Sequence, residues 1–414
     1  MRAIDQLSSI DSLRHAWKSR AGRLRKSCFG VDRVSASDFE RDLDVNLRDI
    51  RRKLLDPDKG YQVTGLLALP KQKPNSDKFR VICIPTFADR LVQFAMLDVL
   101  RPKMRWLGLD NKVSYGIAPG RENSTASAQQ FAVKTRSELP WVYKTDIQQF
   151  FDNIDRDLLR ASVRKVVRHP SMNPLLDRFL ATEIKDGFDR GWREIAKLNG
   201  IRVGRGIRQG MPISPLFAGA YLRDFDRKLI KWGVPVARYV DDLVAFFKSE
   251  AEALEFHLRV QEAFAEIGLS IDPLNEPGSK TGVYAPMASV PFLGMELARK
   301  PSGGYHLLAS SDCIAQCAQR LKEAGSVDFL LEKNVTLTRM GQYFEAVARG
   351  FLTSYSDAAN YEVLRRTIEE SANGAQLRVL RNVFTREQLQ SLNKKQQRFV
   401  GIDRDMLKPS KANK

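Results

Sequence analysis

The sequence is poor in the residues that mark several classes of protein. Its 414 residues include only four cysteines and four histidines, too few for a disulfide-stapled scaffold of this length. Cys313 and Cys317 are four residues apart, with no His or Cys pair of metal-ligand spacing nearby. No apolar run approaches the roughly 20 residues of a membrane-spanning helix. The first twenty residues also lack the apolar core of a secretory signal. We therefore expect reduced thiols, no membrane partner and a location in the cytoplasm.

Acidic residues are few relative to basic ones. The chain has 67 Lys and Arg against 49 Asp and Glu, a net charge of +18 and a pI near 9.8. Because phosphates recruit Lys and Arg and release counterions on contact, this balance favours a polyanionic partner. Basic residues gather between Arg14 and Lys26, where no acid interrupts them. This run is either a solvated helix face or a nucleic-acid contact.

The N-terminal part of the chain has the pattern of helices followed by a hairpin. Residues 1–60 are predicted to be helical, with Ser37 as the cap of a helix whose apolar positions recur from Phe39 to Leu54. Two short apolar segments, at 63–70 and 78–85, enclose a polar turn and predict a β-hairpin.

The middle of the chain mixes strand and helix patterns. Residues 201–215 are rich in glycine and predict a second hairpin, and Pro215 begins a predicted helix. Residues 236–247 have apolar segments on both sides of two acids, which predicts a hairpin with a charged tip. After about residue 305 the pattern is mostly helical. The fold class expected is therefore α+β, with helical ends.

Three carboxylates stand inside apolar, strand-like runs. Asp146 lies in VYKTDIQQFF, and Asp241 and Asp242 lie in ARYVDDLVAFF. Any one of them alone could be a turn residue or half of a salt bridge. Burying an unpaired charge is costly, so three acids on two strands indicate a divalent-cation site. Oxygen ligands suit Mg²⁺, and two such ions can activate a 3′-hydroxyl and stabilise leaving pyrophosphate in phosphoryl transfer.

Three segments resemble the motifs of reverse transcriptases. Tyr-Val-Asp-Asp at 239–242 resembles their YxDD box, KTDIQQFFDNI at 144–154 their first catalytic motif, and GIRQGMPISPLFAGAYL at 206–222 their QGxxxSP motif. The order and spacing of these segments also match. The resemblance implies a right-hand polymerase, with fingers, a palm built on an antiparallel sheet and a helical thumb.

The resemblance continues on both sides of these motifs and points to group II intron-like bacterial enzymes. Gly30–Asp32, the hairpin and helix at 61–100, SKTGV at 279–283 and FLGMEL at 292–297 have counterparts there. SYGIAPGRENST resembles an SxGFRPGR-type segment, with Ile117 and Ala118 in place of Phe and Arg. The domains implied are an N-terminal helical extension and fingers (1–60), fingers with the start of the palm (61–140), palm with a fingers insertion (141–300) and thumb (301–414).

The resemblance assigns catalytic roles residue by residue. Asp146 and Asp241 would bind two Mg²⁺ ions, or Mn²⁺, with Asp242 assisting and the Ile147 carbonyl as a further ligand. Lys280 would protonate the pyrophosphate; alternatively it is an ordinary surface lysine.

The same resemblance implies a binding site for the incoming nucleotide. Lys71 and Arg80 would hold the triphosphate, as cations suited to phosphate, unless they are merely exposed hairpin charges. Phe151 would exclude a 2′-hydroxyl, unless it is a core residue. Gln209 and Gly210 would contact nucleotide and template, since glycine permits close backbone approach.

Departures from the family's larger members narrow the expected function. The sequence has no appended endonuclease, RNase H-like or integrase segment, and its only Val-Thr-Gly, at 63–65, lies outside the thumb where retron enzymes carry theirs. It most resembles the defence-associated bacterial enzymes, which implies copying of a structured non-coding RNA into cDNA from dNTPs in antiphage defence. The alternative is a maturase that mainly binds intron RNA. An RNA-directed RNA polymerase is disfavoured by Phe151 and by YVDD in place of GDD. The oligomeric state stays open.

Overall fold

The computed structural model describes residues 2–72, 79–104, 106–116, 124–393 and 395–396. It divides the chain into two compact units, Met1–Pro286 and Met287–Lys414. The expected thumb boundary at residue 301 therefore lies inside the second unit, and the division of the first unit into fingers and palm stays a prediction. Residues Ile117 and Ala118 lie outside the described ranges. Within those ranges no helix is long and apolar enough to cross a membrane.

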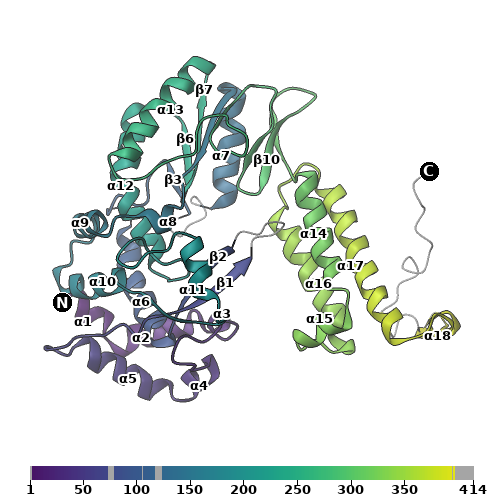
Figure 1. Cartoon of the computed structure of the whole chain (residues 1–414), viewed down its shortest axis with the longest axis horizontal. Helices are drawn as coiled ribbons and strands as arrows, with labels where there is room; N and C mark the ends of the chain where they lie inside the picture. The colour runs from purple at the N-terminus through teal and green to yellow at the C-terminus, as the bar shows by residue number, and fades with distance from the viewer. Residues whose placement is uncertain (1, 73–78, 105, 117–123, 394, 397–414) are drawn as a thin grey trace. The chain divides into compact units, whose positions relative to one another are not determined.

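The centre of the first unit is a five-stranded sheet in the order β3-β6-β7-β4-β8. Only the β3–β6 pair is parallel; the other three pairs are antiparallel. The strands are β3 (Ser114–Tyr115), β4 (Trp141–Asp146), β6 (Val236–Tyr239), β7 (Asp242–Phe247) and β8 (Gly282–Tyr284). This confirms the α+β class with an antiparallel sheet, and it confirms the hairpin with an acidic tip, formed by β6 and β7 (Figure 1).

Helices pack on this sheet because its strands are apolar. The helix α7 (Thr125–Glu138) contacts β6 and β7, and α13 (Glu250–Ala265) contacts β4, β7 and β8. The long α12 (Ser214–Trp232) begins with Pro215 in its first turn, as predicted, and ends at Gly233, whose φ of 69° suits a left-handed cap. Between β4 and α12 the chain forms α8 (Phe150–Asn153), α9 (Arg156–Val166) and α10 (Asn173–Leu180).

A second, three-stranded sheet has the order β2-β1-β5. The predicted hairpin is β1 (Leu66–Gln72) and β2 (Phe79–Pro85), and β5 (Ile184–Gly187) joins β1 in parallel. The helix α11 (Trp192–Leu198) packs against β1 and β2. The predicted hairpin at 201–215 is wrong: residues 201–213 form turns without a strand. Gly204, Gly206 and Gly210 all have positive φ there, which interrupts a regular strand.

The N-terminal residues are helical, as predicted, in the segments α1 (Ala3–Leu7), α2 (Ile10–Lys18), α3 (Ala21–Leu24), α4 (Ala36–Arg41) and α5 (Leu43–Leu54), followed after the hairpin by α6 (Phe87–Leu100). The predicted cap at Ser37 is wrong. Ser35 is the cap, since its side chain accepts a hydrogen bond from the backbone amide of Asp38. The predicted helix is also interrupted at Asp42, between α4 and α5. Next to this interruption the Asn46 side-chain amide donates a hydrogen bond to the Phe39 carbonyl oxygen.

The second unit combines a small sheet with helices. Its strands β9 (Val290–Phe292), β10 (Met295–Arg299) and β11 (Tyr305–Leu308) are antiparallel. The helices that follow are α14 (Ser311–Glu323), α15 (Val327–Glu332), α16 (Leu337–Ser354), α17 (Tyr361–Val383) and α18 (Arg386–Ser391). The mostly helical C-terminal part is thus confirmed.

Candidate active site

The three predicted carboxylates meet at one end of the five-stranded sheet. Asp146 is the last residue of β4, and Asp242, the first of β7, is its partner in the antiparallel register. Residues directly opposite each other in such a pair point to the same face. Asp241 precedes Asp242 in the turn between β6 and β7. The strand pairing therefore brings the two motifs together as the sequence predicted.

Backbone hydrogen bonding extends this pairing beyond the strands. The Ile147 amide donates to the Asp241 carbonyl oxygen at 3.1 Å. Val240, the residue before Asp241, has a φ of 56°. The turn that carries Asp241 is thus both sharp and tied directly to the end of β4.

The electrostatics of the carboxylates differ from one to the next. Burial, and then the charge of Asp146, raise the pKa of Asp241 to about 6. Asp146 pairs with the ammonium group of Lys280, and Asp242 pairs with Lys144 at 3.0 Å. Burial lowers the pKa of Lys280, but the hydrogen bond to Asp146 and the nearby carboxylates outweigh it and raise that pKa overall. The Asp241 carboxylate is therefore costly to ionise in this environment.

A cavity of about 380 Å³ adjoins Asp241. Its lining is Arg80, Phe151, Gln209, Gly210, Met211, Ser214, Pro215 and Asp241. Five residues that the sequence singled out, from four separate segments, therefore line one cavity. Lys71 is not in this lining, but it lies directly opposite Arg80 in the β1–β2 register and is exposed, as Arg80 is.

The loop with Gln209 and Gly210 is attached to the hairpin. The Cys83 amide donates to the Gln209 carbonyl at 2.6 Å. Gly210 has a φ of 106°, and a Cβ there would lie 2.6 Å from the Cys83 carbonyl oxygen. A side chain at 210 would be strained by both its backbone angle and its space, so glycine is required for this close approach.

Comparison with known proteins decides the family. The model of the family "Reverse transcriptase (RNA-dependent DNA polymerase)" matches residues 69–297, more than half of the chain. The chain belongs to this family. It is accordingly an RNA-directed DNA polymerase with the polymerase fold of reverse transcriptases. The three segments that resemble its catalytic motifs, 144–154, 206–222 and 239–242, fall inside the matched range.

This reverse transcriptase aligns with most of one relative and with a small part of another. It is 26% identical over 332 residues to Protein YkfC of Escherichia coli strain K12, covering 69% of this chain and 81% of that protein. It is 30% identical over 159 residues to the group II intron-encoded protein LtrA of Lactococcus lactis subsp. cremoris, covering 38% of this chain and 24% of LtrA. This chain thus spans about a quarter of LtrA.

Among solved structures, apo telomerase from Candida tropicalis matches with a TM-score of 0.42 and 14% identity, covering 84% of this chain and 64% of that one. This degree of similarity adds nothing to the family assignment.

Polymerases of this family use divalent metal ions, and the donors here suit them. Among the described residues, no three His, Cys, Asp or Glu side chains are arranged as a metal-binding group. Lys144 and Lys280 form ion pairs with Asp242 and Asp146. Asp146 and Asp241 nevertheless repel each other, as the raised pKa of Asp241 indicates. Two carboxylates leave coordination positions for water and substrate phosphates, as Mg²⁺ prefers.

A half-buried carboxylate, Glu183, was missed by the sequence analysis. It accepts hydrogen bonds from Arg156 at 2.7 Å, from Arg208 at 2.6 Å and from the Gly204 amide at 2.9 Å. Burial raises its pKa, but the Gly204 amide and Arg208 outweigh this and lower the pKa overall. Glu183 directly precedes β5 and so connects the smaller sheet to the loop of Gln209. No local pattern marks it, because its partners are distant in sequence.

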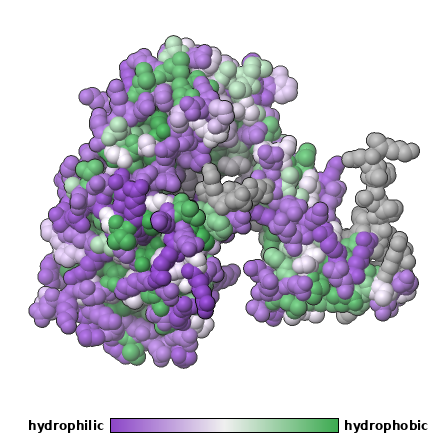
Figure 2. All heavy atoms as spheres, in the orientation of Figure 1, coloured by the Kyte–Doolittle hydropathy of each residue, from purple (hydrophilic) through white to green (hydrophobic). Residues whose placement is uncertain are grey.

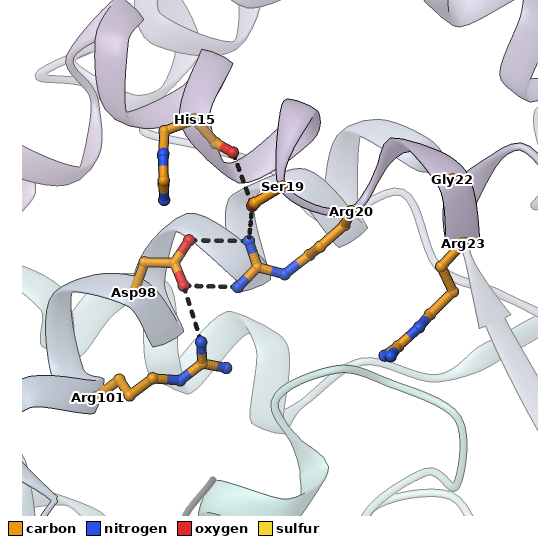
Figure 3. A pocket seen from close by; sticks show the side chains of 7 residues that line it. All are labelled: His15, Ser19, Arg20, Gly22, Arg23, Asp98 and Arg101. Carbon is orange, nitrogen blue, oxygen red and sulfur yellow. Dashed lines mark hydrogen bonds and ion pairs between the residues drawn. The ribbon is translucent and has the colours of Figure 1, made fainter. Parts of the chain in front are cut away.

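The basic N-terminal run proves to be partly neutralised. Arg14 pairs with Asp44, Arg25 with Glu40, and Arg20 with Asp98. Some of these residues line a cavity of about 430 Å³, whose full lining is His15, Ser19, Arg20, Gly22, Arg23, Asp98 and Arg101 (Figure 3). Hydrophilic side chains cover much of the visible face of the first unit around these helices (Figure 2). This cavity carries more positive than negative groups, which suits a phosphate backbone.

Proposed function

We propose that this reverse transcriptase copies a structured non-coding RNA into cDNA by two-metal phosphoryl transfer, in the cytoplasm and in defence against phage. The observation that carries the chemical part is the convergence of Asp146 and Asp241 beside a cavity lined by Arg80, Phe151 and Gln209. Acids for metal ions and a cation for phosphates thus adjoin one space for a nucleotide.

In this proposal Asp146 and Asp241, with the Ile147 carbonyl, bind two Mg²⁺ ions, and Mn²⁺ can replace them. Bound metal ions lower the pKa of the attacking hydroxyl and stabilise charge on the leaving group. Asp242, which forms an ion pair with Lys144, assists Asp146 and Asp241. Lys280, beside Asp146, supplies a proton to the departing pyrophosphate.

In this proposal the nucleotide is held by the β1–β2 hairpin, by Phe151 and by the loop at 209–210. Arg80 and Lys71 bind the triphosphate, and Arg80 can do so with two parallel hydrogen bonds. Phe151 lies under the sugar and excludes a 2′-hydroxyl, so deoxynucleotides are selected. Gln209 and Gly210 contact the base pair through a loop held against Cys83.

The defence role and the template depend on the resemblance described above and need a separate test. Cells carrying the gene with its flanking sequence are challenged with phage, and nucleic acid copurifying with the protein is sequenced. The proposal predicts protection that is lost in Asp146→Asn, together with an RNA and its cDNA in the purified material. Protection that persists in Asp146→Asn would contradict an effector role for DNA synthesis.

The second candidate is a maturase-type role in RNA folding, favoured by the similarity to the group II intron-encoded LtrA. A binding role needs the basic surface but not the carboxylates. Asp146→Asn would leave such a role intact and would abolish only cDNA synthesis. The same variant therefore separates the two functions.

A further inference from the structure

The turn between β6 and β7 holds a residue in an unfavourable conformation. Val240 has a φ of 56°, and a β-branched side chain in the left-handed region is a genuine outlier. Such a conformation persists only when its surroundings over-determine it. The next residue is Asp241, so whatever holds Val240 also holds this carboxylate.

One buried arginine donates to this turn. Arg238, on β6, is fully buried and donates a hydrogen bond from Nη1 to the Val240 carbonyl at 2.8 Å. Its Nε and Nη2 donate to the two carboxylate oxygens of Asp226 at 2.7 and 2.6 Å. Its Nη2 also donates to Ser114 Oγ on β3 at 2.9 Å. The guanidinium group thus links the Val240 carbonyl to Asp226 on α12 and to Ser114 on β3.

Asp226 anchors this arginine to α12. Its side chain is only 3% exposed, and Asn111 also donates to it, at 3.1 Å. The helix α12 begins at Ser214 and Pro215, which line the nucleotide cavity. The helix α12 therefore lines the cavity at its first turn and is linked to the turn before Asp241 through Asp226 and Arg238.

Stability alone does not account for this arrangement. Burying a charged pair costs desolvation, and apolar side chains of equal volume usually stabilise a core as well or better. What the ion pair adds is direction, because the planar guanidinium presents donors at fixed angles. Here one of those donors points at the strained residue before Asp241.

We propose that Arg238 is a positioning residue for catalysis: by binding the Val240 carbonyl it holds the strained turn, and with it Asp241, against Asp146. The inference deepens the proposed function, since it depends on Asp241 as a catalytic carboxylate. It needs no contact between Arg238 and substrate. Arg238 acts on the reaction only through the backbone of the turn.

The test compares Arg238→Lys, Val240→Gly and the double variant. Lysine keeps the charge opposite Asp226 but cannot bind both Asp226 oxygens and the Val240 carbonyl together. Glycine adopts a φ of 56° without a Cβ penalty. Each protein is assayed for primer extension on RNA, for kcat, for KM of dNTP and for the Mg²⁺ concentration at half-maximal rate, at a temperature where urea titration shows it folded.

We expect Arg238→Lys to lower kcat at least tenfold and to raise the Mg²⁺ requirement, with KM for dNTP changed less than threefold. Adding Val240→Gly to Arg238→Lys should raise kcat several-fold above that of Arg238→Lys alone. Val240→Gly in the wild type should not raise kcat. The matched control is Arg90→Lys, another buried arginine that donates to backbone carbonyls, at Pro85 and Cys28. It should lose stability while keeping its kcat and Mg²⁺ requirement.

Two results would overturn the inference. One is a loss of kcat in Arg238→Lys no larger than in Arg90→Lys at matched folded fraction. The other is a Val240→Gly effect that is the same in both backgrounds. If Arg238→Lys does not fold, Asp226→Asn loosens the same arginine and is measured in the same way. Inclusion of Asp241→Asn separates the hypotheses: an active Asp241→Asn refutes the proposed function, whereas an inactive one with an unaffected Arg238→Lys refutes this inference alone.

Discussion

The backbone amide of Ile147 donates a hydrogen bond to the carbonyl oxygen of Asp241 at 3.1 Å. This contact continues the β4–β7 ladder past its last strand pair, Asp146 and Asp242. It joins two motifs that are distant in the sequence and fixes their relative register. A one-residue slip in that register would turn one of the acids to the opposite face of the sheet. The carboxylate cluster therefore depends on backbone pairing as much as on side chains.

Phe151 is expected to control sugar selection. Phe151→Ala removes the ring that lines the nucleotide cavity and so admits a 2′-hydroxyl. The ratio of kcat/KM for dNTP to that for rNTP should fall about tenfold or more. Phe188→Ala, at a partly exposed phenylalanine that does not line the cavity, should leave the ratio unchanged. An unaltered ratio in Phe151→Ala would contradict the role.

Arg80 and Lys71 should contribute unequally to nucleotide binding. Only Arg80 lines the cavity, although the two residues are register partners. Arg80→Ala should raise KM for dNTP about tenfold, equivalent to about 1.4 kcal/mol, and Arg80→Lys should recover part of this because charge returns without the bidentate geometry. Lys71→Ala should have the smaller effect. The reverse order in steady-state kinetics would refute the assignment.

Asp241 should destabilise the metal-free protein at neutral and higher pH. Its pKa is raised from 3.8 to about 6, mainly by burial, so the folded state binds a proton that the unfolded state releases. The resulting loss of folding stability is absent below about pH 4, grows between pH 4 and 6 and is complete above that range. Asp241→Asn should therefore stabilise the protein in EDTA by about 1–3 kcal/mol at pH 8 and hardly at all at pH 4. Urea titrations at both values check this, and an equal effect at both would contradict it.

Glu183 should support nucleotide binding through the loop of Gln209. Glu183→Gln keeps the shape of the side chain but leaves Arg156 and Arg208 without their shared counter-charge. We expect a loss of about 2–3 kcal/mol in stability and a several-fold rise in KM for dNTP. Asp177→Asn is the control, because Asp177 also lies between two arginines, Arg160 and Arg164, but on α10. A rise in KM shared by both variants would argue against a specific role of Glu183.

The sequence was most informative where chemistry and local pattern coincide. Asp146 and Asp241 stand within apolar, strand-like runs of the sequence, where an unpaired charge is costly to bury, so the hairpin and the cluster were both predictable. The N-terminal cap was misplaced by two residues, at Ser37 in place of Ser35, because either serine satisfies the same local pattern.

Long-range polar contacts could not be predicted. Glu183 with Arg208, Arg238 with Asp226, and Arg20 with Asp98 are each set by tertiary packing. The basic run at the N-terminus looked unneutralised for the same reason, since its acids come from elsewhere in the chain. In residues 201–213, glycines with positive φ replaced the predicted strands by turns.

The most direct test of the account is primer extension on an RNA template with dNTPs and Mg²⁺, comparing wild type, Asp241→Asn and Asp224→Asn, with RNA affinity measured in parallel. Asp224 is an exposed acid on α12 paired with Arg227. The account predicts a loss of at least about a thousandfold in rate for Asp241→Asn, unchanged RNA affinity, and normal extension by Asp224→Asn. Extension by Asp241→Asn at the wild-type rate would contradict it.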